Sequence, residues 1–421
     1  MNNSRRNVQR IIIIGGGAAG FFGAITAATH NPNLSITILE ASRHPLHKVR
    51  ISGGGRCNVT HACFDPKELA QHYPRGSKAL RGPFSRFQPR DTSQWFQNHG
   101  VSLKTEADGR MFPTTDDSDT IAQCLLHTAQ QAGITLETQT PVQAVERHSS
   151  GFRVSLRHGD PRECDRLLLA TGSHPSGYRF AQNLGHSLIP PVPSLFTFNI
   201  RDPQLTQLAG ISVPNVEISL PDNHLKQHQL KQHQLKQQGP LLITHWGLSG
   251  PAVLKLSAWG ARTLHDCHYR TSIRLNWLPQ HNPETLHQIY HRQKADHPRK
   301  TLGSVSPIPL SRRLWNYHLN AVEIDPQTRW AELSKKAMNR LNQQLLQSQY
   351  PLSGKGIFKD EFVTCGGINL KEINFKTLES RICPHLYLAG ELLDIDGITG
   401  GFNFQNAWTT SWLAGQALAQ P

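Results

Sequence analysis

The chain has 421 residues, 37% of them hydrophobic and 18% charged, which is long enough for two or three globular domains. Its net charge of +14 favours an anionic partner, such as a dinucleotide, an acidic small molecule or RNA, although a basic solvated surface explains the excess equally well. No apolar run approaches the roughly 18 residues that span a bilayer, and the N-terminus lacks the apolar core of a signal peptide. We therefore expect a cytoplasmic protein without a membrane span.

The cysteines are widely spaced and form no CxxC pair, and none stands at zinc-finger spacing from histidines. This pattern is typical of reduced thiols in a reducing compartment. The sequence predicts no metal site.

The chain opens with the pattern of a βαβ unit. Residues 11–14 are a short β-branched run typical of a buried parallel strand, residues 18–29 predict a helix, and residues 35–39 predict the next strand. Between the first strand and the helix lies GGGAAG, residues 15–20, which fits the GxGxxG dinucleotide fingerprint.

Each residue of the fingerprint has a physical role. Gly15 permits the tight turn, Gly17 lets the backbone approach a pyrophosphate, and Gly20 lets helix and strand pack closely. The helix N-terminus, including Ala18, offers free N–H donors and a partial positive charge. Glu40 ends the second strand, where its carboxylate can accept hydrogen bonds from ribose hydroxyls.

A second glycine-rich element, KVRISGGGRCN, covers residues 48–58. Its consecutive glycines, including Gly54 and Gly55, allow the backbone to lie beside a ligand. Arg50 and Arg56 can bind a phosphate or a substrate carboxylate. Cys57 is either a packed structural thiol or a thiol close to the cofactor.

The first domain continues with a helix over residues 120–132 and strands over 135–145, 152–156 and 166–170, the last leading into Thr171-Gly172. Prolines at 190, 191 and 193 then mark a boundary. We predict strands at 216–220 and 270–278, and a strand, a glycine turn and a helix beginning at Pro251 within 241–257. The clearest helix of residues 283–347 is expected to begin at Asp325-Pro326.

A repeat, LKQHQLKQHQLKQQ, occupies residues 225–238 and matches neither the strand nor the helix period. We interpret it as an exposed loop. Its histidines lack a nearby carboxylate or cysteine, which argues against a metal site there.

The C-terminal segment distinguishes FAD from NAD. A strand over residues 386–388 ends in Ala389-Gly390-Glu391, and Gly400-Gly401 precede a final helix that begins near Asn403. In FAD proteins of this fold such an acid faces the ribityl chain, and the helix N-terminus stabilises negative charge on the reduced ring. A simple NAD dehydrogenase has no need for this late return, so the sequence predicts FAD.

Several segments together resemble the bacterial BaiN-like, or aminoacetone-oxidase-like, family of FAD-binding flavoproteins. They are IIIIGGGAAG, KVRISGGGRCNVTH, GRMFP, LLLATGS, GPLLITHWGLSGPAVLKLS, FVTCGGINLKEIN and LYLAGELLDIDGITGGFNFQNAW, and they span nearly the whole chain. The sequence departs from the family at Ser173, where a glycine is typical, and in the HQLK repeat.

The resemblance implies an α/β fold in which a discontinuous Rossmann-type FAD-binding domain carries an inserted small β-barrel with a helical subdomain. The expected parts are residues 1–190 and 355–421 for the FAD-binding domain, 191–281 for the barrel, 282–347 for the helices and 348–354 for the returning strand. From the motifs and the resemblance together, the expected FAD contacts are Gly15, Gly17, Ala18, Ala19, Gly20, Glu40, Ala41, Lys48, Gly54, Gly55, Arg56, Cys57, Asn58, Val142, Ala170, Thr171, Gly172, Gly390, Glu391, Gly401, Phe402 and Asn403.

The leading functional interpretation is an NAD(P)H-linked oxidoreductase that passes two electrons through FAD to a small, unidentified substrate, for which the basic charge favours an anion. Only one GxGxxG is present, so NADPH or NADH must bind transiently. Catalytic residues stay unassigned, with Cys57, His245 and Asp394 as candidates.

Two alternatives remain open. One is an RNA-directed, tRNA-modifying flavoprotein, because residues 73–90 hold cations without an acid and interleave Tyr73, Phe84 and Phe87. The competing and preferred interpretation of the same stretch is a solvated loop flanking the active site. The other alternative is a flavin-binding protein without catalytic activity.

Overall fold

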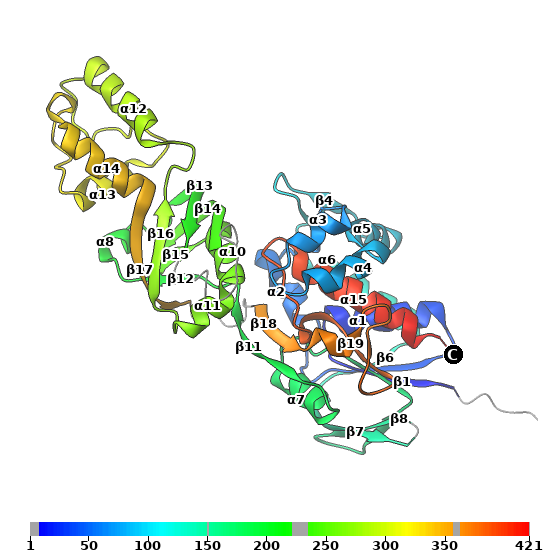
Figure 1. Ribbon diagram of the computed structural model, residues 1–421. Helices are drawn as coiled ribbons and strands as arrows, with labels where there is room; N and C mark the ends of the chain where they lie inside the picture. The colour runs from blue at the N-terminus through cyan, green and yellow to red at the C-terminus, as the bar shows by residue number, and fades with distance from the viewer. Residues whose placement is uncertain (1–7, 150, 221–234, 357–362, 421) are drawn as a thin grey trace, which may run out of the picture. The chain divides into compact units, whose positions relative to one another are not determined.

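The computed structural model describes residues 8–149, 151–220, 235–356 and 363–420. It divides into two units (Figure 1), one formed by Met1–Val192 with Val363–Pro421 and the other by Pro193–Phe362. We call the first the discontinuous unit and the second the insert. The predicted fold class is confirmed, with a Rossmann-type parallel sheet in the first unit and a barrel in the second.

The discontinuous unit is built on a sheet of order β19-β20-β21-β10-β1-β2-β6. Its parallel core consists of β21 (Leu386–Leu388), β10 (Arg166–Leu169), β1 (Arg10–Ile14), β2 (Ser35–Leu39) and β6 (Thr135–Glu137). The two remaining strands, β19 (Ile373–Asn374) and β20 (Glu379–Ser380), run antiparallel at one edge. Because β21 pairs with β10, the C-terminal segment completes the sheet that the N-terminus begins.

Two helices cover one face of this sheet (Figure 1). They are α1 (Ala18–His30) and α15 (Phe402–Leu418), and they lie against each other. Close approach depends on glycine, since a Cβ at Gly415 would lie 2.6 Å from the backbone oxygen of Gly23. Further helices complete this side: α2 (His47–Gly55), α3 (Pro66–Gln71), α4 (Ser77–Arg86), α5 (Pro89–Asn98) and α6 (Ser118–Gln131).

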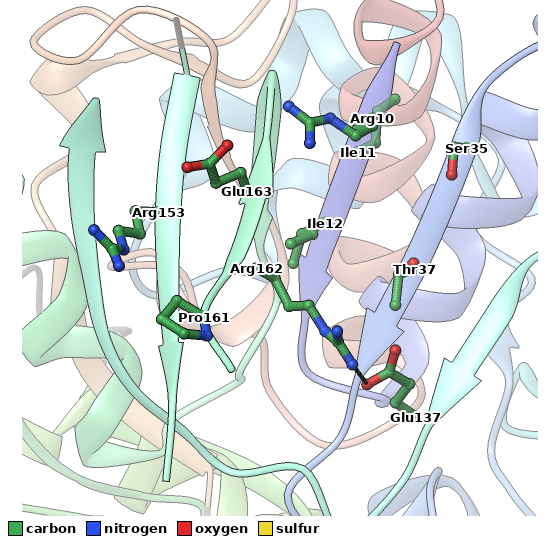
Figure 2. Close-up of a pocket in the computed structure, with 10 residues that line it drawn as sticks. All are labelled: Arg10, Ile11, Ile12, Ser35, Thr37, Glu137, Arg153, Pro161, Arg162 and Glu163. Atoms are coloured by element: carbon green, nitrogen blue, oxygen red, sulfur yellow. Dashed lines mark hydrogen bonds and ion pairs between the residues drawn. The ribbon is translucent and has the colours of Figure 1, made fainter. Parts of the chain in front are cut away.

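A three-stranded meander of β7 (Val142–His148), β8 (Gly151–Leu156) and β9 (Arg162–Cys164) lies on the opposite face. The segment 135–145, which was predicted as one strand, forms two strands, β6 and the start of β7. Gln139 adopts a left-handed conformation with φ of 56°, and Pro141 follows it, so the chain turns between them. A cavity of about 450 Å³ lies between the meander and the amino-terminal part of β1 (Figure 2).

The insert contains a closed barrel of order β12-β15-β14-β13-β16-β17. Its strands are β12 (Phe198–Ile200), β13 (Ser212–Ser219), β14 (Lys236–Thr244), β15 (Gly247–Ser249), β16 (Thr271–Asn276) and β17 (Ser348–Lys355). The stretch predicted as a returning strand or linker, 348–354, is a strand, and it belongs to the barrel, where it pairs with β12 and β16. The proline-rich boundary forms β11 (Leu188–Ser194), which pairs with β18 (Val363–Ile368).

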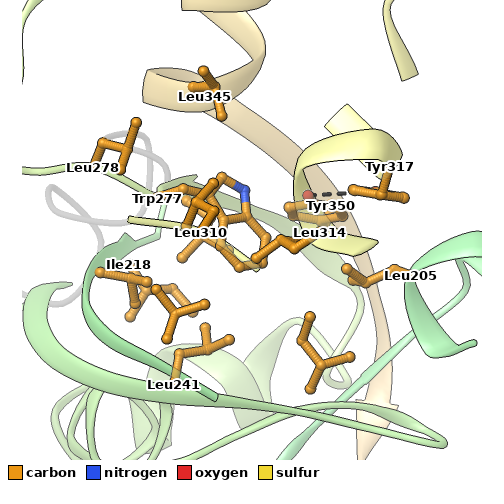
Figure 3. Packing of buried hydrophobic residues seen from close by; sticks show 14 of the residues in the cluster. Leu205, Ile218, Leu241, Trp277, Leu278, Leu310, Leu314, Tyr317, Leu345 and Tyr350 are labelled. Carbon is orange, nitrogen blue, oxygen red and sulfur yellow. Dashed lines mark hydrogen bonds between the residues drawn. The ribbon is translucent and has the colours of Figure 1, made fainter. Parts of the chain in front are cut away.

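The helical subdomain follows β16 and comprises α12 (Pro283–Asp296), α13 (Arg312–Ala321) and α14 (Lys335–Gln347). Its apolar side chains join those of the barrel in one core (Figure 3). Trp277 is fully buried there and donates from its indole N–H to Ser348 Oγ at 3.1 Å. Figure 3 also shows Tyr317, whose hydroxyl lies 3.4 Å from that of Tyr350.

The prediction of a helix beginning at Asp325 is wrong. The Asp325 carboxylate accepts from the N–H of Gln327 in a local turn, and Leu302 N–H donates to Thr328 O at 2.8 Å. These bonds hold the segment in an irregular conformation. The helix begins only at Lys335, where Ser334 caps it by accepting from Ala337 N–H. By contrast, the helix predicted at Pro251 is present as α10 (Pro251–Trp259).

Most of the HQLK repeat, including its histidines, lies outside the described residues. Within the described part of the chain, no helix is long and apolar enough to cross a membrane. The same residues contain no cluster of metal-ligating side chains.

Candidate cofactor-binding site

The glycine turn after β1 has the geometry that the sequence predicts. Gly15 has a φ of 111°, and a Cβ there would lie 2.4 Å from the Ala170 carbonyl oxygen at the end of β10. A Cβ at Gly20 would lie 1.9 Å from the oxygen of Gly15, which explains the close packing of α1 on the strand. A Cβ at Gly17 would meet nothing within 4 Å, so this backbone is open on its outer side.

Glu40 shapes this turn from the end of β2. Its carboxylate accepts from the N–H of Gly16 at 2.6 Å and from the N–H of Ser42 at 2.8 Å. The prediction placed Glu40 beside a ribose. In the structure the side chain fixes the backbone of the glycine turn, a role that spacing alone does not reveal.

Lys48 and Glu391 meet although they are far apart in sequence. Lys48 Nζ lies 2.6 Å from Glu391 Oε2 and donates to Ser173 Oγ at 3.3 Å. The other oxygen, Glu391 Oε1, accepts from Thr364 N–H at 2.9 Å. Gly172 has a φ of 58° and lies beside the same carboxylate. The ends of β10 and β21 and the helix α2 therefore bring their predicted residues to one place.

The start of α15 also lies at this edge of the sheet. Gly401 caps the helix with a φ of 92°, and its N–H donates to the Asn58 side-chain oxygen at 3.0 Å once that amide is oriented to donate to Thr60 O. Gly390 packs against α1, since a Cβ there would lie 3.1 Å from Ala19 Cβ. We call the region formed by the starts of α1 and α15 and the ends of β1, β2, β10 and β21 the cofactor edge.

Both helix starts are suited to anionic groups. Neither α1 nor α15 has a side-chain cap, and neither has an acid in its first turn. Their free N–H groups and the positive ends of their dipoles fit a pyrophosphate and an electron-rich ring. Thr171 Oγ1 is buried at this edge with no hydrogen-bond partner among the described residues. The edge fits FAD.

Other predicted contacts fall around the same edge. Thr140 N–H donates to Glu40 O at 2.9 Å, which brings the start of β7 and Val142 close to Glu40. Gly54 and Gly55 are exposed and have φ values of 69° and 84°, so they allow close approach without side chains. Ala18 begins α1, Ala41 follows Glu40, and Ala170 faces Gly15.

The side chains of Phe402 and Asn403 serve the protein's own structure. The Phe402 ring stacks on His61 at 4.6 Å and on His72 at 4.4 Å between ring centroids. The Asn403 amide binds the Gly397 backbone in both directions, at 2.8 Å and 2.9 Å. At these two positions only the backbone remains for the predicted FAD contact.

The arginines that were expected to attract anions already have acidic neighbours. Arg56 lies 2.7 Å from Glu106 and 4.0 Å above the Phe112 ring, and Arg50 pairs with Asp119. The Glu106 carboxylate raises the pKa of Arg56, against the opposing effect of burial. Their charge is thus largely compensated within the protein.

The catalytic candidates differ in their surroundings. Cys57 is fully buried, and burial raises its pKa to about 12, so it stays a neutral thiol near pH 7. Asp394 is half-buried beyond Glu391, and its N–H donates to Ile368 O at 3.1 Å. His245 is exposed in the turn between β14 and β15 of the insert.

Sequence reasoning missed a buried ion pair and misread its neighbours. Arg75 pairs with Asp396, which is fully buried between Glu391 and Gly401. The aromatic residues of the same stretch, Tyr73, Phe84 and Phe87, are core residues and are not available for stacking on RNA. Residues 73–90 contain no acid, so any carboxylate that pairs with Arg75 had to come from elsewhere in the chain, and this absence was the only signal of the ion pair in the stretch itself.

The cavity of Figure 2 is separate from the cofactor edge. Arg10, Arg153, Arg162, Glu137 and Glu163 line it, with Ile11, Ile12, Ser35, Thr37 and Pro161, and none of these residues is among the predicted FAD contacts. Arg162 and Glu137 lie 3.4 Å apart there, partly exposed.

Comparison with known proteins identifies the family. The model of the HI0933-like protein Rossmann domain matches residues 9–417. The chain belongs to this family. It is accordingly an FAD-dependent oxidoreductase, and the resemblance to BaiN-like flavoproteins is confirmed.

Two relatives match over nearly the full length. A ribosomal RNA dihydrouridine synthase of Escherichia coli K12 is 28% identical over 419 residues, which is 97% of each chain. A 3-dehydro-bile acid delta(4,6)-reductase of Clostridium scindens is 28% identical over 430 residues, 98% of this chain and 100% of the relative. Among solved structures, a 3-ketosteroid-delta4-(5alpha)-dehydrogenase of Rhodococcus jostii RHA1 matches with a TM-score of 0.50 and 13% identity, over 100% of this chain and 99% of that one. That likeness shows the fold alone.

Proposed function

We propose that this protein is an FAD-dependent reductase of a carbon–carbon double bond conjugated to a carbonyl group, and that the bond belongs to a uridine in RNA. The observation that carries the proposal is chemical agreement between two full-length relatives with unlike substrates. Reduction of uridine to dihydrouridine saturates a bond conjugated to the C4 carbonyl. A delta(4,6)-reductase of a 3-dehydro-bile acid likewise saturates a bond conjugated to the C3 ketone.

The basic charge favours RNA, which carries many phosphates, over a small substrate with a single carboxylate. The net charge of +14 suits a polyanion, because phosphate neutralisation supplies most of the affinity of proteins for nucleic acids. A small α,β-unsaturated ketone is the second candidate, since the bile-acid reductase is as similar to this chain as the RNA enzyme is.

The cofactor edge supplies the machinery for either substrate. When bound, FAD accepts two electrons from a reduced nicotinamide and passes them to the substrate as a hydride. The uncapped start of α1 would hold the pyrophosphate of bound FAD, and Glu40, which fixes the glycine turn, would orient the ribose. Glu391 and Lys48 form a charged pair that would hold the ribityl chain of bound FAD. The uncapped start of α15 stabilises negative charge on the reduced ring.

The electron donor in this proposal is NADPH or NADH. The chain contains one GxGxxG, so the nicotinamide binds transiently. Buried Cys57 is a poor proton donor because its thiol holds its proton tightly, which leaves His245 and Asp394 as the catalytic candidates. His245→Ala, assayed for substrate reduction and separately for flavin reduction, tests that role.

The decisive experiment uses the purified protein with its flavin. Heat release and chromatography identify the flavin, and anaerobic mixing with NADPH or NADH measures its reduction. Ribosomal RNA from a strain lacking the gene is then incubated with protein and donor, digested, and analysed for nucleosides that have gained two hydrogens. Dihydrouridine formed only with the donor supports the proposal. Unchanged RNA alongside reduction of a steroidal enone overturns it in favour of the second candidate, and FMN in place of FAD overturns the cofactor on which both candidates depend.

A further inference from the structure

The solvent-facing side of α4 is a basic surface next to the cofactor edge. We define the α4 basic face as Lys78, Arg81 and Arg86 of α4 together with Arg90 at the start of α5. We infer that this face binds the sugar–phosphate backbone of the RNA whose uridine is reduced. The inference rests on the proposed function and specifies where the substrate is held.

Helical periodicity separates the cations of α4 from its core residues. The exposed residues are Lys78, Arg81, Gly82, Ser85 and Arg86, which lie on one side of the helix. The opposite side buries Leu80, Pro83 and Phe84. Because Gly82 and Ser85 are small, they leave room for a phosphate backbone between the cations.

The charge of this face is not neutralised within the described part of the protein. Arg86 donates to neutral acceptors, Lys376 O at 2.6 Å and Gln416 Oε1 at 3.0 Å. No ion pair involves Lys78, Arg81 or Arg90 among the described residues. Arg50 and Arg56, by contrast, are paired with acids. The face therefore differs from the other basic residues near the cofactor edge, and it suits an external polyanion.

The face is joined rigidly to the cofactor edge. Arg75, just before α4, pairs with Asp396, and a Cβ at Gly76 would lie 2.6 Å from Ile395 Cγ1. Tyr73 donates from its hydroxyl to Phe402 O at 2.6 Å. These contacts fasten the chain leading into α4 to the segment between Glu391 and the start of α15. An RNA strand held on α4 is thus held at a fixed place relative to the cofactor.

An exposed aromatic ring accompanies the cations. Phe64 is 41% exposed, and the Arg90 guanidinium lies 5.6 Å from the centre of its ring. An exposed ring beside an arginine suits an unpaired base, which stacks on aromatic and guanidinium planes. The three aromatic residues that the sequence suggested for this role are buried, so Phe64 takes their place.

The test compares two double variants with equal loss of charge. Lys78→Ala/Arg81→Ala removes cations from the α4 basic face. Arg153→Ala/Arg157→Ala removes exposed cations from the meander on the opposite side of the sheet (Figure 1). Both holoproteins are titrated with a labelled single-stranded fragment of ribosomal RNA at several salt concentrations, and FAD content and melting temperature verify folding.

The α4 variant is expected to bind more weakly and to show a salt dependence, d log K/d log[salt], shallower by about 1.4, because two phosphate contacts on a single strand each contribute about 0.7. Its KM for RNA should rise, while the meander variant matches the wild type. Equal binding by the α4 variant and the wild type, with dihydrouridine still formed, overturns the inference and leaves the proposed function intact. Failure of the wild type to bind or reduce RNA overturns both.

Discussion

The two units of the molecule differ in the kinds of side chain that they bury. The discontinuous unit buries charged and polar side chains, among them Asp396, Arg166 and Gln405. The buried polar side chains of the insert are uncharged hydroxyls and an amide, as in Ser257, Thr263 and Asn342, together with His318, neither of whose ring nitrogens is bonded to any described residue. Both units are therefore stabilised by removal of apolar surface from water, and the first adds buried charged side chains and their polar contacts.

The polar contacts of the discontinuous unit converge on α15. Gln405 accepts from Thr60 at 2.5 Å and from Thr92 at 3.0 Å, and Trp408 donates to Val59 O at 2.9 Å. The helix that begins at the cofactor edge thus holds distant segments of the chain together. Damage to these contacts should change both stability and FAD binding, whereas damage to the core of the insert should change stability with little effect on FAD.

The largest effect is expected from Asp396→Ala. This change leaves the Arg75 guanidinium, only 18% exposed, without its carboxylate, and removal of one partner from a buried pair costs about 3–5 kcal/mol. Unfolding in urea and FAD content should both show the loss. Asp108→Ala is the matched control, because its pair with Arg110 is largely exposed and contributes less than about 1 kcal/mol. Equal stability of the two variants would show that the buried ion pair stabilises the protein no more than the exposed one does.

Glu40→Ala should lower FAD affinity about ten- to a hundredfold, which corresponds to the roughly 1.5–3 kcal/mol of a charged hydrogen bond. The carboxylate holds the Gly16 and Ser42 backbones, so the glycine turn loses its shape as well as its ribose contact. Equilibrium dialysis of the apoprotein with FAD measures the change. Glu163→Ala, an exposed glutamate of the meander, is the control. If Glu40→Ala binds FAD as the wild type does, Glu40 neither contacts the ribose nor is needed to hold the glycine turn in its FAD-binding shape.

The contrasting prediction for the insert concerns the stability of the protein at acidic pH. Burial lowers the pKa of His318 to about 3, whereas the unfolded chain binds a proton near pH 6.5. Stability from this residue is therefore constant above about pH 6.5 and falls as the pH drops toward 3, by about 2 kcal/mol at pH 5. His318→Phe should remove that part of the pH dependence of unfolding.

FAD binding by the folded protein should not change with His318→Phe, since the residue belongs to the core of the insert. His291→Phe, at an exposed position of α12, is the control and should leave the pH dependence as it is. A pH profile identical in His318→Phe and wild type would mean that water or another group satisfies the imidazole.

The cofactor edge was predictable because its residues act through backbone conformation. Gly15, Gly20 and Gly401 stand where a Cβ would collide with a backbone oxygen, so the sequence records the geometry directly. The pairing of Lys48 with Glu391 was not predictable, although both residues were expected near FAD. It depends on how β21 docks beside β10, which no local pattern encodes.

The insert was less predictable for a related reason. Asp325-Pro326 has the local chemistry of a helix start, yet tertiary bonds from Leu302 to Thr328 hold the chain in a turn. The same limit applies to residues 73–90 of the discontinuous unit, where the sequence alone does not show which cations are buried and which are exposed. Burial separates Arg75, which is structural, from Lys78 and Arg81, which are exposed. Sequence predicts such a surface only after the partner of each charge is known.

The smallest expected effect concerns the alkylation of cysteine thiols, which differ in exposure between the two units. Cys57 is fully buried at the cofactor edge, and its pKa of about 12 keeps the thiolate fraction negligible at pH 8. Cys267, at the end of a short helix of the insert, is partly exposed. Brief treatment of the native holoprotein with iodoacetamide should therefore modify Cys267 first and leave Cys57 unmodified, as read by peptide mass spectrometry. Treatment in urea is the control for the intrinsic reactivity of both peptides. Rapid modification of Cys57 in the folded protein would mean that the cofactor edge opens to solvent, and Cys57 would then return as a candidate proton donor.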